Sequence, residues 1–160
     1  MKYLFYYETP VGKTGIAEED GAVTDLFFEG ETAPTDAEIK ETTVLKETYR
    51  QLDEYFREQR KEFHVPLKLK GTEFQKRDWA ELLKIPYGET RSYGEIAKAL
   101  GIPKGARAVG LANNRNPISI IVPCHRVIGF DGKLVGYGGG LHIKEALLKL
   151  EKVIQQDENV

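Results

Sequence analysis

The chain of 160 residues contains a single cysteine, Cys124, and this limits how the fold can be held together. One thiol cannot form an internal disulfide, and one cysteine with three scattered histidines is a poor basis for a zinc site. The composition, 41% hydrophobic and 30% charged, is typical of a soluble globular protein. No apolar run approaches the ~20 residues that span a bilayer, and the N-terminus does not resemble a signal peptide. Since a free thiol suits a reducing compartment, we expect a cytoplasmic protein with no membrane partner.

The sequence changes character at Gly71, which suggests an N-terminal domain of residues 1–70 and a C-terminal domain of residues 71–160. Strand-like segments lie at residues 3–7, 15–17 and 23–28, separated by polar turns. A helical stripe follows at Leu45, Tyr49, Leu52 and Phe56. Residues 65–69 are short and extended, typical of an edge strand or linker. The first domain is therefore predicted to be a small sheet packed on a helix.

The second domain is predicted to be mostly helical. Thr72 with Gln75, and Ser92 with Glu95, have the spacing of capping boxes at two helix starts. A third short helix is expected over residues 104–113, after a turn containing glycine. Two short helices joined in this way favour a helix-turn-helix, although an ordinary helical hairpin has the same pattern.

The third helix is unusually small on most of its surface, with Ala106, Ala108, Gly110 and Ala112. Such a helix can approach either a neighbouring helix or a DNA groove closely. The charge distribution bears on that choice. Residues 1–60 carry fourteen acidic and seven basic residues, a net of −7, whereas residues 96–130 carry five basic residues and no acidic one. The basic stretch is consistent with a polyanion-facing surface or with ordinary solvated cations.

Cys124 lies in the run Pro123-Cys124-His125-Arg126, which offers a rigid backbone, a base and a positive charge beside the thiol. These flanks favour thiolate and hence a reactive cysteine, while the alternative is an inert buried thiol. Adjacent side chains in an extended segment point to opposite faces, so a Cys124–His125 relay needs a turn or a bridging water. Glu151, at the edge of the apolar stripe of the last helix, is a candidate to orient His125; its alternative is a solvated position.

The Pro-Cys-His-Arg-Val run resembles the active-site motif of the O6-alkylguanine-DNA alkyltransferases, and the similarity extends from about Gly71 to Glu151. The resemblance implies an α+β (α/β) protein with an N-terminal ribonuclease-H-like sheet-plus-helix domain. It further implies a C-terminal domain with a winged-helix-like helix-turn-helix. The implied function is DNA repair, in which an alkyl group passes irreversibly from flipped O6-alkylguanine to Cys124 in a single turnover.

The resemblance also implies roles for individual residues. The proposed relay consists of Cys124, His125 and Glu151, with Asn116 fixing the local turn. Tyr93 would help to rotate the nucleotide, and Arg107 would fill its place in the stack. The remaining DNA-contacting candidates are Ala106, Gly110, Asn113, Arg115 and Arg126. The guanine pocket would be lined by Tyr93, Val127, Tyr137, Gly138 and Gly139.

Two departures from the family pattern affect these expectations. Gly138 stands where some members have serine, and the N-terminal half lacks the cysteines with which some members bind zinc, so we expect no metal and no cofactor. The expected partner is double-stranded DNA carrying O6-alkylguanine, with O4-alkylthymine as a second candidate, bound by a monomer. Three alternatives remain: a lesion-binding protein without transfer, a helix-turn-helix regulator, and a cysteine hydrolase using Cys124 and His125.

Overall fold

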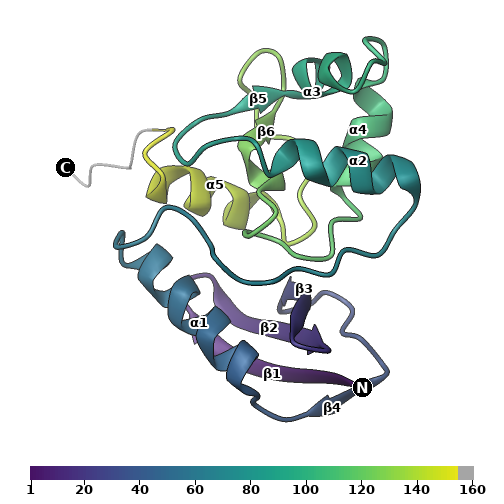
Figure 1. Cartoon of the computed structure of the whole chain (residues 1–160). Coiled ribbons are helices and arrows are strands. Elements are labelled where there is room, and N and C mark those ends of the chain that lie inside the picture. Colours follow the sequence, from purple (N-terminus) through teal and green to yellow (C-terminus); the bar gives the residue numbers. More distant parts are fainter. Residues whose placement is uncertain (155–160) are drawn as a thin grey trace, which may run out of the picture. The chain divides into compact units, whose positions relative to one another are not determined.

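The computed structural model describes residues 1–154, which form two compact units (Figure 1). The first unit contains residues 1–70 together with the short segment 117–121, and the second contains residues 71–116 and the chain from residue 122 onward. The tail predicted at residues 155–160 lies outside the described residues. Among the described helices, none has both the length and the apolar character needed to cross a membrane.

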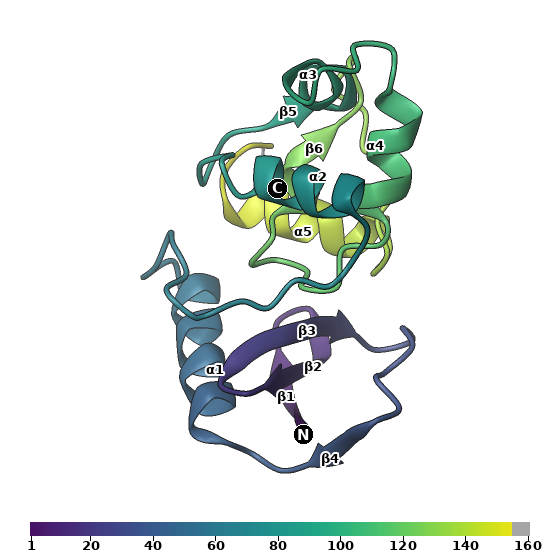
Figure 2. The ribbon, with the colours of Figure 1, turned by 45° about the vertical axis from the view of Figure 1, so that its right-hand side comes forward.

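The first unit is a four-stranded sheet covered on one face by a helix. Its strands are β1 (Lys2–Thr9), β2 (Gly12–Glu19), β3 (Ala22–Phe28) and β4 (Ala37–Ile39), in the order β3-β2-β1-β4. The β1–β2 and β2–β3 pairs are antiparallel, and β4 joins β1 in parallel. Helix α1 (Thr43–Phe56) lies against the sheet in both Figure 1 and Figure 2. The three longer strands were predicted from their sequence pattern, whereas β4 was not.

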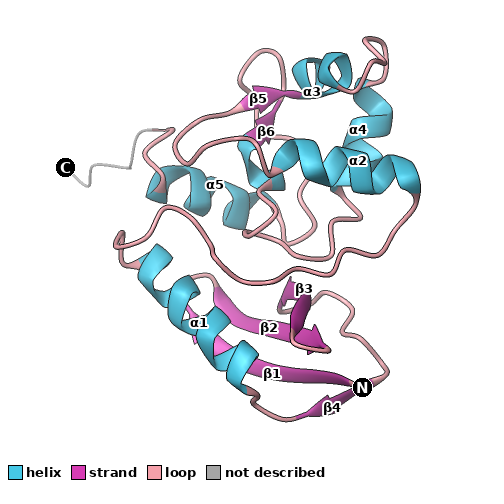
Figure 3. Cartoon of the chain, in the orientation of Figure 1, coloured by secondary structure: helices cyan, strands magenta, loops and turns pink. Residues whose placement is uncertain are grey.

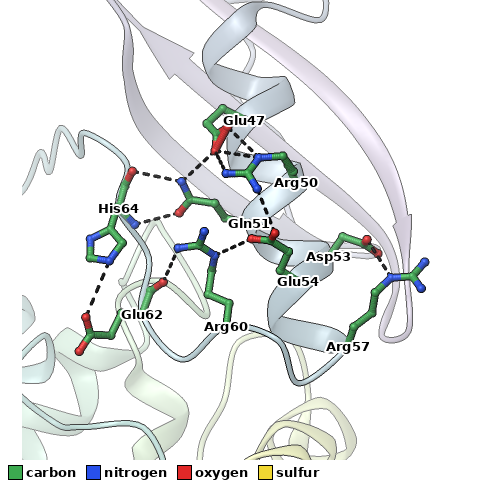
Figure 4. Close-up of polar contacts among 9 residues, drawn as sticks. All are labelled: Glu47, Arg50, Gln51, Asp53, Glu54, Arg57, Arg60, Glu62 and His64. Atoms are coloured by element: carbon green, nitrogen blue, oxygen red, sulfur yellow. Dashed lines mark hydrogen bonds and ion pairs between the residues drawn. The ribbon is translucent and has the colours of Figure 1, made fainter.

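Helix α1 buries Leu45, Leu52 and Tyr55, so Tyr55 rather than the predicted Phe56 is its buried aromatic residue. The outward face carries ion pairs, in which Arg50 bridges Glu47 and Glu54 (Figure 4). Figure 4 also shows buried Gln51 tying the helix to the following loop. Its Oε1 accepts from the backbone N–H of His64 at 2.8 Å, and its Nε2 donates to the His64 carbonyl at 3.2 Å.

The segment of residues 117–121 extends the first unit beyond β3. Leu26 N–H donates to the Pro117 carbonyl at 2.8 Å, and Ser119 N–H donates to the Leu26 carbonyl at 3.1 Å. The segment ends in a tight turn, in which Ile121 N–H donates to the Ser119 carbonyl at 2.8 Å across Ile120. Ile120 has φ +72°, which is rare for a β-branched residue and is tolerated where surrounding contacts fix the backbone. Its side chain is 1% exposed, so the packing of this unit provides those contacts.

The second unit consists mainly of helices joined by loops (Figure 3). Its helices are α2 (Glu73–Leu82), α3 (Tyr93–Ala99), α4 (Ala106–Asn113) and α5 (Leu141–Leu150). A two-residue strand β5 (Arg91–Ser92) pairs in parallel with β6 (Val127–Ile128), directly after the 3-10 helix η1 (Cys124–Arg126). Trp79 of α2 is buried at the centre, and its indole N–H donates to the Ala112 carbonyl of α4 at 3.0 Å.

Both predicted capping boxes are present. The Thr72 and Ser92 hydroxyls accept from the backbone N–H groups of Gln75 and Glu95, whose side chains accept in return. Gly101, at φ +79°, lets the chain turn sharply after α3. Helix α4 begins at Ala106 rather than at the predicted residue 104, so α3 and α4 form the expected helix-turn-helix with a longer turn.

Candidate active site

Two successive backbone turns fix the position of Cys124. Pro123 has φ −83° and ψ 63°, and Cys124 N–H donates to the Val122 carbonyl at 2.8 Å, which together define an inverse γ-turn. The chain then enters η1, where Arg126 N–H donates to the Pro123 carbonyl at 3.0 Å. The turn that a Cys124–His125 relay requires is therefore present. Its cause lies in the sequence, because proline fixes φ near the value that this turn needs.

Asn116 lies beside the thiol. Its side-chain Nδ2 donates to the Val122 carbonyl at 2.8 Å and to Cys124 Sγ at 3.2 Å. The first bond ties the loop before the cysteine to the end of the α4 region, and the second places a donor on the sulfur. A donor on sulfur stabilises the thiolate relative to the thiol. The structure thus places Asn116 where the expected role in fixing the turn requires it.

His125, Glu151 and Arg126 form a buried network behind the thiol. His125 Nε2 lies 2.7 Å from Glu151 Oε2, and both side chains are fully buried. Arg126 contacts both carboxylate oxygens, with Nε 2.8 Å from Oε1 and Nη2 3.1 Å from Oε2, and Gly88 N–H donates to Oε1 at 3.2 Å. Burial alone would raise the pKa of Glu151, but the hydrogen bonds from His125 and Arg126 outweigh burial and hold that pKa below its usual range.

The carboxylate fixes which nitrogen of His125 can face the sulfur. Because Glu151 occupies Nε2, the free position is Nδ1, which is buried and has no hydrogen-bond partner among the described residues. Burial lowers the pKa of His125 despite the carboxylate, so the imidazole is neutral near pH 7 and can accept a proton. Burial at 3% exposure also excludes the solvated alternative for Glu151.

Two sequence expectations require correction here. Arg126 was expected to contact DNA, but its guanidinium is buried and bound to Glu151 and to the Ile85 carbonyl at 2.7 Å. The flanking charges were also expected to favour thiolate. Instead, burial raises the pKa of Cys124 to about 11, and this effect outweighs the hydrogen bond from Asn116, the charge of Lys144 and the cysteine's own backbone hydrogen bond, which lower the pKa. The resting cysteine is therefore a thiol, and its activation requires removal of a proton.

Lys144 of α5 is a site residue that the sequence analysis missed. It is fully buried, and its Nζ donates to the carbonyls of Val127 at 2.6 Å and Val135 at 2.9 Å. Burial lowers its pKa to about 8, while its charge in turn favours the Cys124 thiolate. A signal was present, since Lys144 and Glu151 are seven residues apart on the same helical stripe as the buried Ile143 and Leu147.

Tyr93, the first residue of α3, lies in the same region, since the Cys124 sulfur acts on its phenol electrostatically. Tyr93 Oη donates to the Val135 carbonyl at 2.9 Å, which ties α3 to the glycine-rich loop of residues 129–140. Burial, together with the nearby sulfur, raises the pKa of Tyr93 to about 12, so the phenol remains protonated. A cavity of about 490 Å³ opens beside it, lined by Tyr93, Gly94, Ala106, Arg107, Gly110, Asn114, Gly129, Phe130, Val135 and Gly136.

Four of the residues predicted to line the guanine pocket do not line this cavity, and their role stays a prediction. Val127 is buried and engages Lys144 through its carbonyl, and Tyr137, Gly138 and Gly139 do not line this cavity. Phe130, which the sequence analysis did not select, lies at the cavity and is 95% exposed.

Helix α4 presents a small and basic outward face. Ala106, Arg107 and Arg115 are exposed and Gly110 is partly exposed, as a close-approaching helix requires. Asn113 was expected on the same face, but it is 7% exposed and its amide faces Asp78 of α2, so it cannot contact DNA directly. Within residues 1–154, no cluster of three or more His, Cys, Asp or Glu side chains is arranged to hold a metal ion.

Comparisons with known proteins match nearly the full length of the chain. Residues 2–69 match the ribonuclease-like domain of 6-O-methylguanine DNA methyltransferase, and residues 73–153 match its DNA binding domain. The methylated-DNA–protein-cysteine methyltransferase of Methanosarcina acetivorans is 53% identical, over 93% of this chain and 97% of that protein. The constitutive enzyme of that name from Bacillus subtilis is 47% identical, over 99% and 100%.

Among solved structures, the Mycobacterium tuberculosis OGT in complex with DNA superposes with a TM-score of 0.90 at 50% identity, covering 94% of this chain and 92% of that one. The M. tuberculosis O6-methylguanine methyltransferase gives 0.88 at 49% identity, covering 95% and 93%. The chain therefore belongs to the 6-O-methylguanine DNA methyltransferase family.

Proposed function

We propose that this protein repairs DNA by transferring the alkyl group of O6-alkylguanine to Cys124 Sγ, once per chain. The observation that carries the proposal is the environment of the sulfur. Asn116 donates to Sγ at 3.2 Å, and His125, the next residue in the chain, is held by Glu151 with 2.7 Å between Nε2 and Oε2. The membership of the family and the relatives named methylated-DNA–protein-cysteine methyltransferase support the same reaction.

The first step is removal of the thiol proton. The neutral imidazole of His125 accepts it at Nδ1 through a bridging water, while Glu151 stabilises the imidazolium that forms. Asn116 and the ammonium of Lys144 stabilise the sulfur anion. Their effect opposes that of burial, which holds the resting thiol in its protonated form.

The second step is displacement at the alkyl carbon. The thiolate attacks this carbon, a C–S bond forms, and the bond between the carbon and guanine O6 breaks. The bonding electrons remain on the guanine, which takes up one proton and returns to its ordinary form. The product is a stable thioether, and the chain contains no second cysteine that could take the alkyl group from Cys124. The alkyl group therefore stays on the protein.

The same geometry requires the lesion to leave the duplex. The sulfur is 7% exposed at the second unit's core, so an oxygen inside a base stack cannot reach it. We assign the cavity beside Tyr93 to the extruded nucleotide, and the outward face of α4 to the DNA groove. Arg107, which is exposed and lines the cavity, is placed to occupy the space that the nucleotide vacates.

We further propose the oligomeric state, the second substrate and the compartment in which the reaction takes place. All proposed catalytic groups belong to one chain, which suits a monomer acting on double-stranded DNA without a cofactor. O4-alkylthymine carries its alkyl oxygen in an equivalent position and is proposed as a second substrate. The cytoplasm suits this chemistry, because Cys124 must stay reduced until it reacts.

The decisive test is the intact mass of the protein after incubation with a duplex containing one O6-methylguanine. We expect a gain of one methyl group per chain, located by peptide mapping on the peptide that holds Cys124. Cys124→Ser should show no gain while it still binds the duplex, because binding depends on α4.

The three alternatives give different results in the same assay. A cysteine hydrolase would release product repeatedly without a stable gain in mass, and a lesion binder or a regulator would show no gain at all. Either pattern with the wild-type protein would refute the proposed transfer.

A further inference from the structure

Asp78 of α2 is a buried carboxyl group that the mechanism above does not use. It is fully buried and lies beside the last turn of α4. With its amide nitrogen turned toward the acceptors, Asn113 donates both to Asp78 Oδ2 and to the Val109 carbonyl of its own helix. The neighbouring Trp79 donates to the Ala112 carbonyl at 3.0 Å. Two consecutive residues of α2 therefore hold the C-terminal end of α4.

A continuous set of contacts leads from this end of α4 to the sulfur. Asn116 N–H donates to the Asn113 carbonyl at 3.1 Å, and Asn116 Nδ2 donates to Cys124 Sγ at 3.2 Å. The same amide holds the Val122 carbonyl at 2.8 Å. Asp78 thus supports the residue that positions the thiol, through the backbone of Asn113.

Asp78 also acts on the thiol through its charge. Two buried groups act on the Cys124 thiol through their charges: the ammonium of Lys144 favours the thiolate, and the carboxylate of Asp78 disfavours it. From α4, the group that faces Asp78 is the neutral amide of Asn113. Its neighbour on α2, Arg77, directs its guanidinium to the Leu100 carbonyl at 2.9 Å and so is engaged elsewhere. Burial raises the pKa of Asp78 to about 7, which places its change of charge near neutral pH.

We propose that Asp78 is a positioning residue whose charge also governs Cys124: it holds Asn113 in place, and its ionisation opposes formation of the thiolate. A neutral Asp78 permits activation, and a carboxylate retards it. The effect on alkyl transfer rests on the proposed function, whereas the effect on the ionisation of the thiol does not.

The test is Asp78→Asn, which removes the charge and keeps an oxygen that can accept from Asn113. We expect the ratio of its transfer rate to that of the wild type to be about one below pH 6. The ratio should rise to ~3- to 10-fold above pH 8, equivalent to a shift of half to one pKa unit in the thiol. The midpoint of the rise should lie near pH 7. Glu73→Gln, the same chemical change on an exposed side chain of α2, should give a ratio of one throughout.

A second measurement separates this inference from the proposed function. The absorbance of the thiolate, taken as the difference between each protein and its Cys124→Ser counterpart, gives the titration of the thiol without any DNA. The Cys124 thiol of Asp78→Asn should titrate at lower pH than the thiol of the wild type, even if no alkyl transfer occurred. Asp78→Ser, which is also neutral and can accept from Asn113, should behave in the same way and provides the comparison if Asp78→Asn does not fold. A rate ratio independent of pH, or an unshifted thiol titration, would overturn the proposal.

Discussion

At the scale of single residues, Cys124 and His125 illustrate how neighbours in sequence become partners only indirectly. The imidazole contacts Glu151, 26 positions away in the sequence, through Nε2, and its Nδ1 is buried with no hydrogen-bond partner among the described residues. In the proposed relay the three groups act in series, and each needs the next to move one proton. Residues that act as one unit have strongly non-additive effects when they are changed together.

This arrangement predicts the outcome of a double-mutant cycle. His125→Ala and Glu151→Gln should each slow alkyl transfer by ~100-fold or more, in the range typical of general-base catalysis. The double variant should be little slower than the worse of the two single variants, because one relay can be lost only once. The measurement is single-turnover transfer of a labelled methyl group, with circular dichroism to confirm that each variant is folded. Losses that multiply in the double variant would show that Glu151 acts independently of His125.

The sequence predicts some of these residues and not others, for physical reasons. Cys124 and His125 stand in one short run that a local motif identifies, and Asn116, eight positions earlier, was predicted only from the family resemblance. Arg126 was placed on the DNA surface because a charged side chain in a basic stretch is usually solvated, and only the structure shows its buried partner Glu151. Lys144 and Asp78 were missed because their environments are formed by other helices, which no local pattern reveals.

At the scale of elements, the reliable predictions were those that depend on local chemistry. Both capping boxes define helix starts through bonds between residues three apart, and the structure contains both. The strands β4, β5 and β6 have two or three residues each and exist only through pairing with distant segments. Their sequences carry no sufficient periodicity, although the β5–β6 pair ties the start of α3 to the segment that follows η1.

The small side chains of α4 lead to a prediction for a substitution at Gly110. A Cβ at this position would meet only the Tyr93 ring, at 3.8 Å, which is ordinary van der Waals contact. Gly110→Ala should therefore fold and gain about 0.5–1 kcal/mol of stability, since alanine is the better helix former. The added methyl group would lie at the cavity beside α4 and obstruct close approach of DNA.

We accordingly expect Gly110→Ala to raise the melting temperature while it weakens binding of a methylated duplex by several-fold. Its reaction with the free base O6-benzylguanine should change much less, because that substrate needs no groove contact. Thermal unfolding, fluorescence anisotropy and single-turnover alkylation give the three quantities. Unchanged duplex affinity would remove this part of α4 from the DNA interface.

At the scale of the whole molecule, the net charge does not reveal the basic stretch that we propose contacts DNA. The chain carries a formal net charge of −2, yet residues 96–130 contain five basic residues and no acidic one. The structure reduces this set, because Arg126 is buried while Lys98, Lys104, Arg107 and Arg115 are exposed. The affinity for DNA should therefore depend on four cations at most from this stretch.

That count predicts the salt dependence of binding. Each phosphate neutralised contributes about −0.9 to the slope of log K against log salt, so four cations from this stretch would give a slope of about −3.6. Arg115→Ala and Lys104→Ala should each make the slope shallower by up to about 0.9, with similar effects on duplexes of different sequence. Arg126→Lys should leave the slope unchanged, since its side chain faces Glu151 and not solvent. Binding isotherms over a range of salt concentrations measure these slopes, and a shallower slope for Arg126→Lys would mean that its guanidinium leaves the buried network to contact DNA.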